Sequence, residues 1–250
     1  MAELAFGFQG ELLTSGYCAN VYADSSRVLK VPFQGEELDS GFRATLAYSE
    51  TVGPRVIASD VESSSILMER IVPGTTLDVH GLSDEAQLQI CVGFALRVRE
   101  ISLAAPLPLA KYFEIPSLLV RELLSTTTTE CFLHGDLHHE NVLWGSDRWW
   151  LIDPKGLFGD PAFEAAAYLH NPLSVMARAS DSELIDLAKH RIAQWAESLG
   201  VSPDRIWAWA VAVAQSCIAD GFENCRRELA ALMPLAPHFG ATGWATLVSQ

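Results

Sequence analysis

A short stretch of the chain gathers residues that can do chemistry. The segment "FLHGDLHHENVLWGSDRWWLIDP", residues 132–154, holds three His, three Asp and one Glu between two apolar segments. Imidazole and carboxylate groups at such close spacing can ligate a metal directly. The same groups can also form a loop that transfers a phosphoryl group from a nucleotide to a hydroxyl. The spacing of the individual residues decides between these two chemistries.

A metal site built on histidines fits the spacing poorly. His134, Asp136 and His138 stand at alternate positions, as in some metallohydrolase loops. The sequence lacks the H-E-x-x-H spacing of zinc hydrolases, however, and no second histidine cluster follows. The pattern therefore disfavours a metal held directly by these imidazoles.

A phosphoryl-transfer loop fits the spacing better. Kinases carry H-x-D-x-x-x-x-N, in which the Asp accepts the proton of the attacking hydroxyl and the Asn binds magnesium. His134, Asp136 and Asn141 occupy these positions without a gap. Asp153 ends the next apolar run, "WWLID", at the place of a second magnesium ligand. Magnesium prefers carboxylate and amide oxygens to imidazole nitrogens, so this set of residues suits it.

The elements that must position this loop fall into two groups. Early in the chain, short apolar runs such as "RVLKVPF" alternate with turn signals, which predicts strands and one helix that ends at Gly53-Pro54. From Ser83 onward, capped segments with helical periodicity dominate. We therefore expect an α+β fold with a small β-rich lobe, residues 1–73, and a larger helical lobe, residues 74–250. Ligand sites commonly lie between such lobes.

Charge and composition narrow the class of partner. The formal net charge is −14, from 31 acidic and 17 basic residues, so the surface repels nucleic acid and anionic membranes and attracts cationic small molecules. The longest apolar run, residues 206–219, is short for a membrane span, and the N-terminus lacks the basic segment of a signal peptide. The five cysteines are scattered and form no C-x-x-C pair, which fits a reducing compartment. We expect a cytoplasmic protein with a cationic small-molecule partner; the sequence does not predict its oligomeric state.

Two segments carry a resemblance to a known family. "HGDLHHENVL" and "IDPKGLFGDPAFEAA" resemble the aminoglycoside and hydroxyurea phosphotransferases, and within them the streptomycin 6-kinases, with strong similarity over residues 132–172. The resemblance implies a protein-kinase-like two-lobed fold, ATP, two magnesium ions and transfer of phosphate to a hydroxyl of a small molecule. By position in the motif, Asp136 matches the catalytic base, Asn141 and Asp153 match the magnesium ligands, and His134 matches a histidine that supports the loop.

The resemblance also assigns a lysine to the nucleotide. Lys30, which lies inside an apolar strand, matches the strand lysine that holds the α- and β-phosphates of ATP. The helix acid that pairs with this lysine would come from Glu36, Glu37 or Asp39, and Glu37 is the preferred choice.

Two backbone segments complete the expected nucleotide site. Gly16 lies in "TSGYCAN", which matches the loop that covers the phosphates, although this loop departs from the G-x-G-x-x-G pattern of protein kinases. Glu69 and Ile71 of "LMERI" match the hinge, where the carbonyl of the first and the amide of the second would face adenine.

Other polar residues near the motif allow more than one interpretation. Glu164 in "GDPAFEAA" matches an acid that hydrogen-bonds the backbone of the catalytic loop. Asp160 either faces the substrate or caps the helix that begins near Pro161. His138 either contacts the substrate or phosphate, or is an ordinary polar loop residue, and the sequence assigns no role to its neighbour His139.

These observations predict an ATP-dependent kinase that acts on a hydroxyl of a small molecule. An aminoglycoside such as streptomycin is the expected acceptor, since such antibiotics are polycations and the chain is acidic, and the enzyme would then confer antibiotic resistance. Two alternatives stay open. One is a kinase of hydroxyurea, a sugar or another small metabolite, and the other is a catalytically silent nucleotide-binding module. The intact set Lys30, Asp136, Asn141 and Asp153 argues against the silent module.

Overall fold

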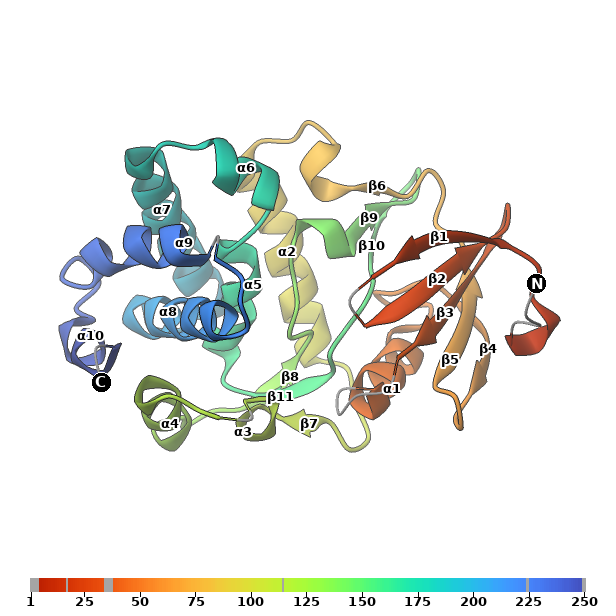
Figure 1. Cartoon of the computed structure of the whole chain (residues 1–250), viewed down its shortest axis with the longest axis horizontal. Coiled ribbons are helices and arrows are strands. Elements are labelled where there is room, and N and C mark those ends of the chain that lie inside the picture. The colour runs from red at the N-terminus through yellow and green to blue at the C-terminus, as the bar shows by residue number, and fades with distance from the viewer. Residues whose placement is uncertain (1–4, 17, 34–37, 114, 224, 249–250) are drawn as a thin grey trace.

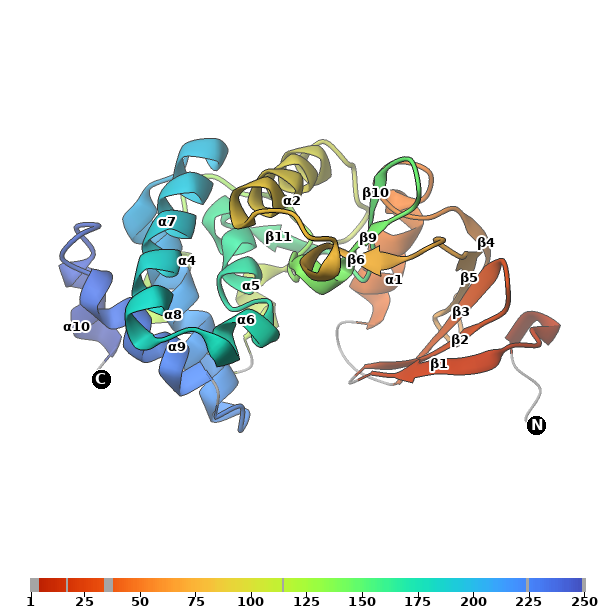
Figure 2. The same cartoon turned by 90° about the horizontal axis from the view of Figure 1, so that it is seen from above.

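The structure is a computed structural model that describes residues 5–16, 18–33, 38–113, 115–223 and 225–248. Figure 1 shows a five-stranded sheet at one end of the molecule and α7, α8, α9 and α10 at the other, with α1, α2 and smaller sheets between them. The view from above in Figure 2 gives the same division. The expected α+β fold, with strands first and helices later, is confirmed.

The first sheet places the central lysine. Its order is β1-β2-β3-β5-β4, every neighbouring pair is antiparallel, and the strands span β1 Glu11–Ser15, β2 Ala19–Ala23, β3 Arg27–Pro32, β4 Val56–Asp60 and β5 Ser65–Glu69. Alternation along β3 buries Leu29 against Phe8 and Leu67. The next residue, Lys30, therefore projects from the opposite face of the sheet, toward the rest of the molecule.

Two small sheets frame the motif segment. One has the order β10-β9-β6 and the other β7-β11-β8, with bounds β6 Thr75–Thr76, β7 Leu107–Pro108, β8 Cys131–Leu133, β9 Val142–Trp144, β10 Trp149–Leu151 and β11 Leu157–Gly159. The motif loop runs between β8 and β9, and Asp153 lies between β10 and β11. Because β8 and β11 pair antiparallel, with Leu157 opposite Leu133, the motif loop begins beside the point where the Asp153 loop ends.

The remaining chain is mostly helical. The helices are α1 Leu38–Tyr48, α2 Asp84–Arg99, α3 Leu109–Tyr112, α4 Leu118–Ser125, α5 Ala165–Leu169, α6 Leu173–Arg178, α7 Asp181–Leu199, α8 Pro203–Ala219, α9 Cys225–Leu232 and α10 Thr242–Val248. Short 3-10 turns are η1 Ala5–Gly7, η2 Leu77–Val79, η3 His139–Asn141, η4 Pro161–Glu164 and η5 Met233–Leu235. Apolar side chains of most helices form one core around the fully buried Trp195, Trp207 and Trp209. A smaller apolar cluster joins α6, α7 and α9. None of the helices in the described ranges is long and apolar enough to cross a membrane.

Local signals in the sequence explain several helix ends. The Ser83 side chain accepts a hydrogen bond from the backbone N–H of Ala86 at the start of α2. Ser180 and Glu183 form a reciprocal capping box on α7, and Gly200 ends that helix in the left-handed conformation. The chain leaves the first sheet at Glu69 and enters the second at Thr75, so the boundary expected after residue 73 falls in this crossing and stays a prediction.

Candidate active site

The buried ring of His134 holds the motif loop in place through two hydrogen bonds. Its ring is fully buried, and Nε2 lies 2.9 Å from the carbonyl oxygen of Ile152. Nδ1 accepts the backbone N–H of Asp136 at 3.2 Å. Since a carbonyl only accepts, these contacts require a neutral ring that carries its proton on Nε2. Burial lowers the pKa of His134 to about 4, in agreement with a neutral ring. The expected supporting role of His134 thus has a geometric basis.

The Glu164 carboxylate also holds this loop, through hydrogen bonds to its backbone. This buried carboxylate accepts the backbone N–H of His134 at 2.8 Å and that of Gly135 at 3.3 Å, which confirms the hydrogen bonding expected of it. Burial raises its pKa to about 7, although both backbone donors act to lower it. Gly135 has a φ of +83°, and a Cβ there would lie 2.7 Å from the side chain of Leu157. Only glycine fits this turn.

Asp136 of the motif loop reaches the surface, whereas its neighbour Asn141 is buried. The Asp136 side chain is 36% exposed. Asn141 donates its Nδ2 to the carbonyl oxygen of Asp136 at 2.8 Å, and the same nitrogen lies 3.2 Å from Nε2 of His138. The Asn141 amide is therefore oriented so that its oxygen, Oδ1, is the atom that can face a cation. Nε2 of His138 also lies 3.8 Å from Asp136 Oδ1, so His138 stands between the two proposed catalytic groups.

Asp153 meets Lys30 across the two lobes. The Asp153 side chain is 51% exposed, and its Oδ1 accepts a hydrogen bond from Lys30 Nζ. Burial acts to raise the pKa of Asp153, but the charge and hydrogen bond of Lys30 outweigh it and lower this pKa. The backbone φ of Asp153 is +61°, a strained conformation for a residue with a side chain. Such strain is typical of functional sites.

Helix α1 fixes the segment that follows Asp153. The hydroxyl of Ser40 donates to the carbonyl oxygen of Lys155 at 2.8 Å. A Cβ on Gly41 would lie 2.8 Å from the carbonyl oxygen of Pro154, so only a glycine allows the helix to approach this closely. The helix of the first lobe is thereby tied to the proposed metal-binding segment.

The donor set suits magnesium better than a transition metal. In the described ranges, His, Cys, Asp and Glu side chains form no group of three or more that could hold a metal. Asn141 and Asp153 offer one amide oxygen and one carboxylate. Magnesium binds through one or two protein ligands of this kind and completes its shell with water and phosphate oxygens. The residues present therefore fit Mg²⁺ bound together with a nucleotide.

Other residues expected at the nucleotide site are placed as follows. Gly16 lies in the β1–β2 turn, where its N–H donates to the carbonyl oxygen of Ala19 at 2.9 Å. Glu69 ends β5, and Ile71 follows it in the crossing to β6. Two of the candidate partners of Lys30, Glu36 and the preferred Glu37, lie outside the described residues.

The third candidate partner of Lys30 is engaged elsewhere. Asp39 forms an ion pair with Arg43 at 2.8 Å, one turn along α1. Within the described residues, the ion pair that Lys30 makes is the one with Asp153.

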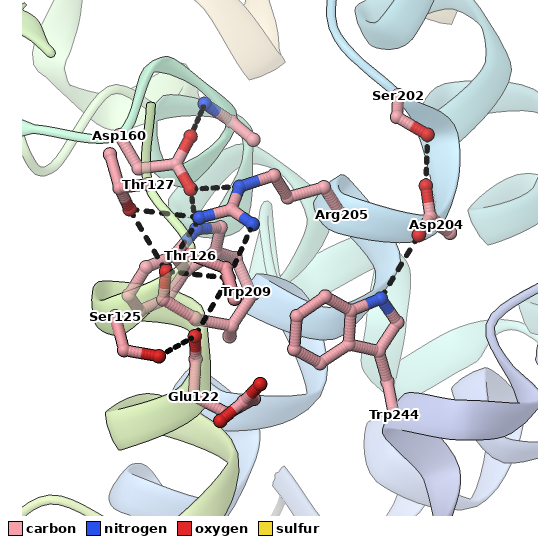
Figure 3. A network of polar contacts seen from close by, with 12 residues as sticks. Glu122, Ser125, Thr126, Thr127, Asp160, Ser202, Asp204, Arg205, Trp209 and Trp244 are labelled. Carbon is pink, nitrogen blue, oxygen red and sulfur yellow. Dashed lines mark hydrogen bonds and ion pairs between the residues drawn. The ribbon is translucent and has the colours of Figure 1, made fainter. Parts of the chain in front are cut away.

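Asp160 does not face a ligand, which corrects one of its two interpretations. Its carboxylate is 3% exposed. Oδ1 caps η4 by accepting the N–H of Ala162 at 3.0 Å, so the capping interpretation is confirmed. Oδ2 accepts from Arg205 Nε and, at 2.6 Å, from Trp209 Nε1 (Figure 3). A carboxylate surrounded by these donors has no access to a substrate.

No signal in the sequence predicts the contacts that surround Asp160. Arg205 and Trp209 both lie on α8, 45 and 49 residues beyond Asp160. No local motif joins residues so far apart, and "IWAWAVAVA" indicates only a buried helix. The sequence assigns no role to His139, and the structure shows that its ring is fully buried and stacks on Tyr168 with centroids 4.3 Å apart.

Sequence comparisons with known proteins assign this chain to a family. A sequence model of the aminoglycoside/hydroxyurea antibiotic resistance kinases matches residues 110–221. A streptomycin 3''-kinase of Klebsiella pneumoniae is 33% identical over 227 residues, which cover 81% of this chain and 84% of that protein. This chain belongs to the aminoglycoside/hydroxyurea antibiotic resistance kinase family.

More distant relatives agree with this assignment. A streptomycin 6-kinase of Streptomyces griseus is 28% identical over 217 residues, covering 76% of this chain and 69% of that protein. The crystal structure of a thermostable mutant of the aminoglycoside phosphotransferase APH(4)-Ia, in a ternary complex with AMP-PNP and hygromycin B, superimposes with a TM-score of 0.59. It covers 93% of this chain and 95% of that one at 16% identity, so it establishes the kinase-like fold.

Proposed function

We propose that this protein transfers the γ-phosphate of ATP to a hydroxyl of an aminoglycoside, with streptomycin as the first acceptor to test. The observation that carries the proposal is the outward-facing Asp136. It is partly exposed and lies beside Asn141, on a loop whose backbone is hydrogen-bonded by the side chains of His134 and Glu164. The similarity to streptomycin kinases supports this choice of acceptor.

Each group has a defined part in the proposed reaction. The acceptor oxygen forms a bond to the γ-phosphorus while the bond from that phosphorus to the β–γ bridging oxygen breaks. Asp136 takes the proton of the acceptor hydroxyl. Asn141 and Asp153 would hold Mg²⁺, which when bound offsets the negative charge of the phosphate oxygens.

The nucleotide would lie between the lobes. Lys30 would move its ammonium from Asp153 toward the α- and β-phosphates, which is feasible because the ion pair is partly exposed. The turn at Gly16 would cover the phosphates, and the backbone of Glu69 and Ile71 would face adenine.

The charge of the chain favours a cationic acceptor. The formal net charge of −14 raises the local concentration of cations near the surface. This argument favours aminoglycosides over hydroxyurea or a neutral sugar as the acceptor. It does not identify the hydroxyl that is phosphorylated, and the two relatives above differ on that point, since they are named 3''- and 6-kinases.

A phosphorylation screen tests the proposal. The protein is incubated with Mg²⁺ and ATP and, separately, with streptomycin, other aminoglycosides, hydroxyurea and neutral sugars, and each acceptor is examined by mass spectrometry. We expect streptomycin to gain one phosphate group, at a position that fragmentation will identify. Phosphorylation of hydroxyurea or a sugar instead would change the acceptor. Binding of ATP without transfer to any acceptor would favour the silent module.

A further inference from the structure

The buried network around Asp160 joins three elements that are distant in the sequence. Arg205 of α8 contacts the Asp160 carboxylate and donates from its other nitrogens to Leu123 O at 2.6 Å, Thr127 Oγ1 at 2.8 Å and Thr126 Oγ1 at 3.1 Å. Figure 3 shows the guanidinium between the carboxylate and the threonines that follow α4. One side chain thus ties α8 to η4 and to the end of α4.

The same network reaches the catalytic loop through η4. Asp160 caps the start of this 3-10 turn, and Glu164 ends it, four residues later, with its carboxylate on the backbone N–H groups of the catalytic loop. Between them, the ring of Phe163 packs edge-on against the indole of Trp209, with centroids 5.3 Å apart. Trp209 therefore holds η4 twice, through its N–H on Asp160 and through its ring on Phe163.

We propose that Arg205 and Trp209 are positioning residues for catalysis. They fix Asp160 and thereby η4, and η4 sets the place of Glu164. Glu164 in turn fixes the backbone of His134 and Gly135, which immediately precede Asp136 in the chain. This inference rests on the proposed function, in which Asp136 is the base.

A small displacement of η4 should have a large effect on the rate of phosphate transfer. Proton transfer requires Asp136 within hydrogen-bond reach of the acceptor hydroxyl, and a shift of about 1 Å from a distant substitution can lower the rate about 100-fold. Most of the proposed ATP contacts, at Lys30, Asp153 and the backbone of Glu69 and Ile71, lie outside this loop, so a shifted loop should lower kcat more than it changes KM.

Helix α8 supplies a matched pair of variants. Trp207 and Trp209 are both fully buried, and each donates one indole N–H, to Leu232 O at 2.7 Å and to Asp160 Oδ2 at 2.6 Å respectively. Trp209→Phe and Trp207→Phe each keep an aromatic ring and remove one donor. Only the first removes a contact to the network that supports the loop.

Two readouts test the inference. The first is kcat with the acceptor found in the screen, which we expect to fall about 10-fold in Trp209→Phe with KM for ATP unchanged, and to stay near the parent value in Trp207→Phe. The second is hydrogen exchange of the backbone amides of His134 and Gly135, which should be about 10-fold faster in Trp209→Phe alone. Asp160→Asn provides the same comparison if Trp209→Phe does not fold.

The two readouts separate this inference from the proposed function. If the parent protein phosphorylates no acceptor, the proposed function fails, while the exchange rates still test whether α8 supports the loop. Equal exchange rates in the two tryptophan variants would overturn the inference. So would faster exchange with an unchanged kcat, because the loop support would then be irrelevant to catalysis.

Discussion

The open side of the active site and its buried support are built differently. On the open side, the Asp153 carboxylate is 51% exposed and meets Lys30 across the lobes. In the support, the Asp160 carboxylate is 3% exposed and accepts from Ala162, Arg205 and Trp209. An exposed pair can exchange partners when a ligand arrives, whereas a buried and fully bonded carboxylate cannot. Stability should therefore depend mainly on the support. Activity should depend on both regions, directly on the open side and indirectly on the support, which positions the loop.

The largest effect on stability is expected at Asp160. Asp160→Ala leaves the partly buried Arg205 guanidinium without its carboxylate and the fully buried Trp209 indole N–H without its acceptor, which should lower the free energy of unfolding by about 3–5 kcal/mol. Urea denaturation measures this change. Asp39→Ala is the matched control, since it removes a carboxylate from a surface pair with Arg43 and should cost about 1 kcal/mol or less. Equal losses in the two variants would contradict the distinction between the two regions.

The buried histidines should make stability depend on pH. In the unfolded chain His134 titrates near 6.5, but burial lowers its folded pKa to about 4 and lowers the pKa of His139 in the same direction. The unfolded state then binds more protons, so the free energy of unfolding should rise as pH increases from 4 to 6.5. The shift of His134 corresponds to about 3 kcal/mol. Glu164, with its raised pKa, opposes this trend between 4.5 and about 7, but it is one group against two.

A single substitution tests the pH dependence. His139→Phe keeps the stack on Tyr168 and removes one of the two titrating rings. Denaturation of the variant at pH 4 to 6.5 should show a smaller rise than the parent chain. An identical rise in both proteins would mean that His139 is not held neutral by burial.

A medium effect on stability is expected from substitution of Glu164. Glu164→Gln places an amide NH₂ opposite one of the two backbone N–H donors of His134 and Gly135, so one donor loses its acceptor. We expect a loss of about 1–3 kcal/mol in unfolding free energy. We also expect a lower kcat, because the loop backbone is displaced. Glu183→Gln, in the exposed capping box of α7, is the control and should leave kcat unchanged.

The smallest effect on stability is expected at Lys30. Lys30→Met removes a partly exposed ion pair, and the free energy of unfolding should change by less than about 1 kcal/mol. ATP affinity, measured by calorimetry, should nevertheless fall. A large loss of stability with unchanged ATP affinity would reverse the roles given to the two regions.

The sequence predicts the motif loop because the residues of this loop are contiguous. His134, Asp136 and Asn141 lie within one loop, and a fixed spacing identifies such a motif. The capping role of Asp160 was also predictable, since Asp followed by Pro is a local signal for the start of a helix.

The support could be predicted only in part. The contact from Glu164 to the loop followed from the family resemblance, whereas Arg205 and Trp209 reach Asp160 through tertiary packing alone. The partner expected for Lys30 at Glu37 stays a prediction, and the contact with Asp153 had no signal in the spacing of the residues.

The most direct measurement compares Asp136→Ala with the parent protein. Phosphate transfer to the acceptor is followed by mass spectrometry, alongside ATP binding and urea denaturation. Because Asp136 is partly exposed and supplies the proposed base, we expect transfer to fall by about 10²–10⁴-fold while ATP affinity and unfolding free energy stay close to those of the parent. Transfer at the parent rate in this variant would contradict the assignment of Asp136 as the base, and with it the account of the active site.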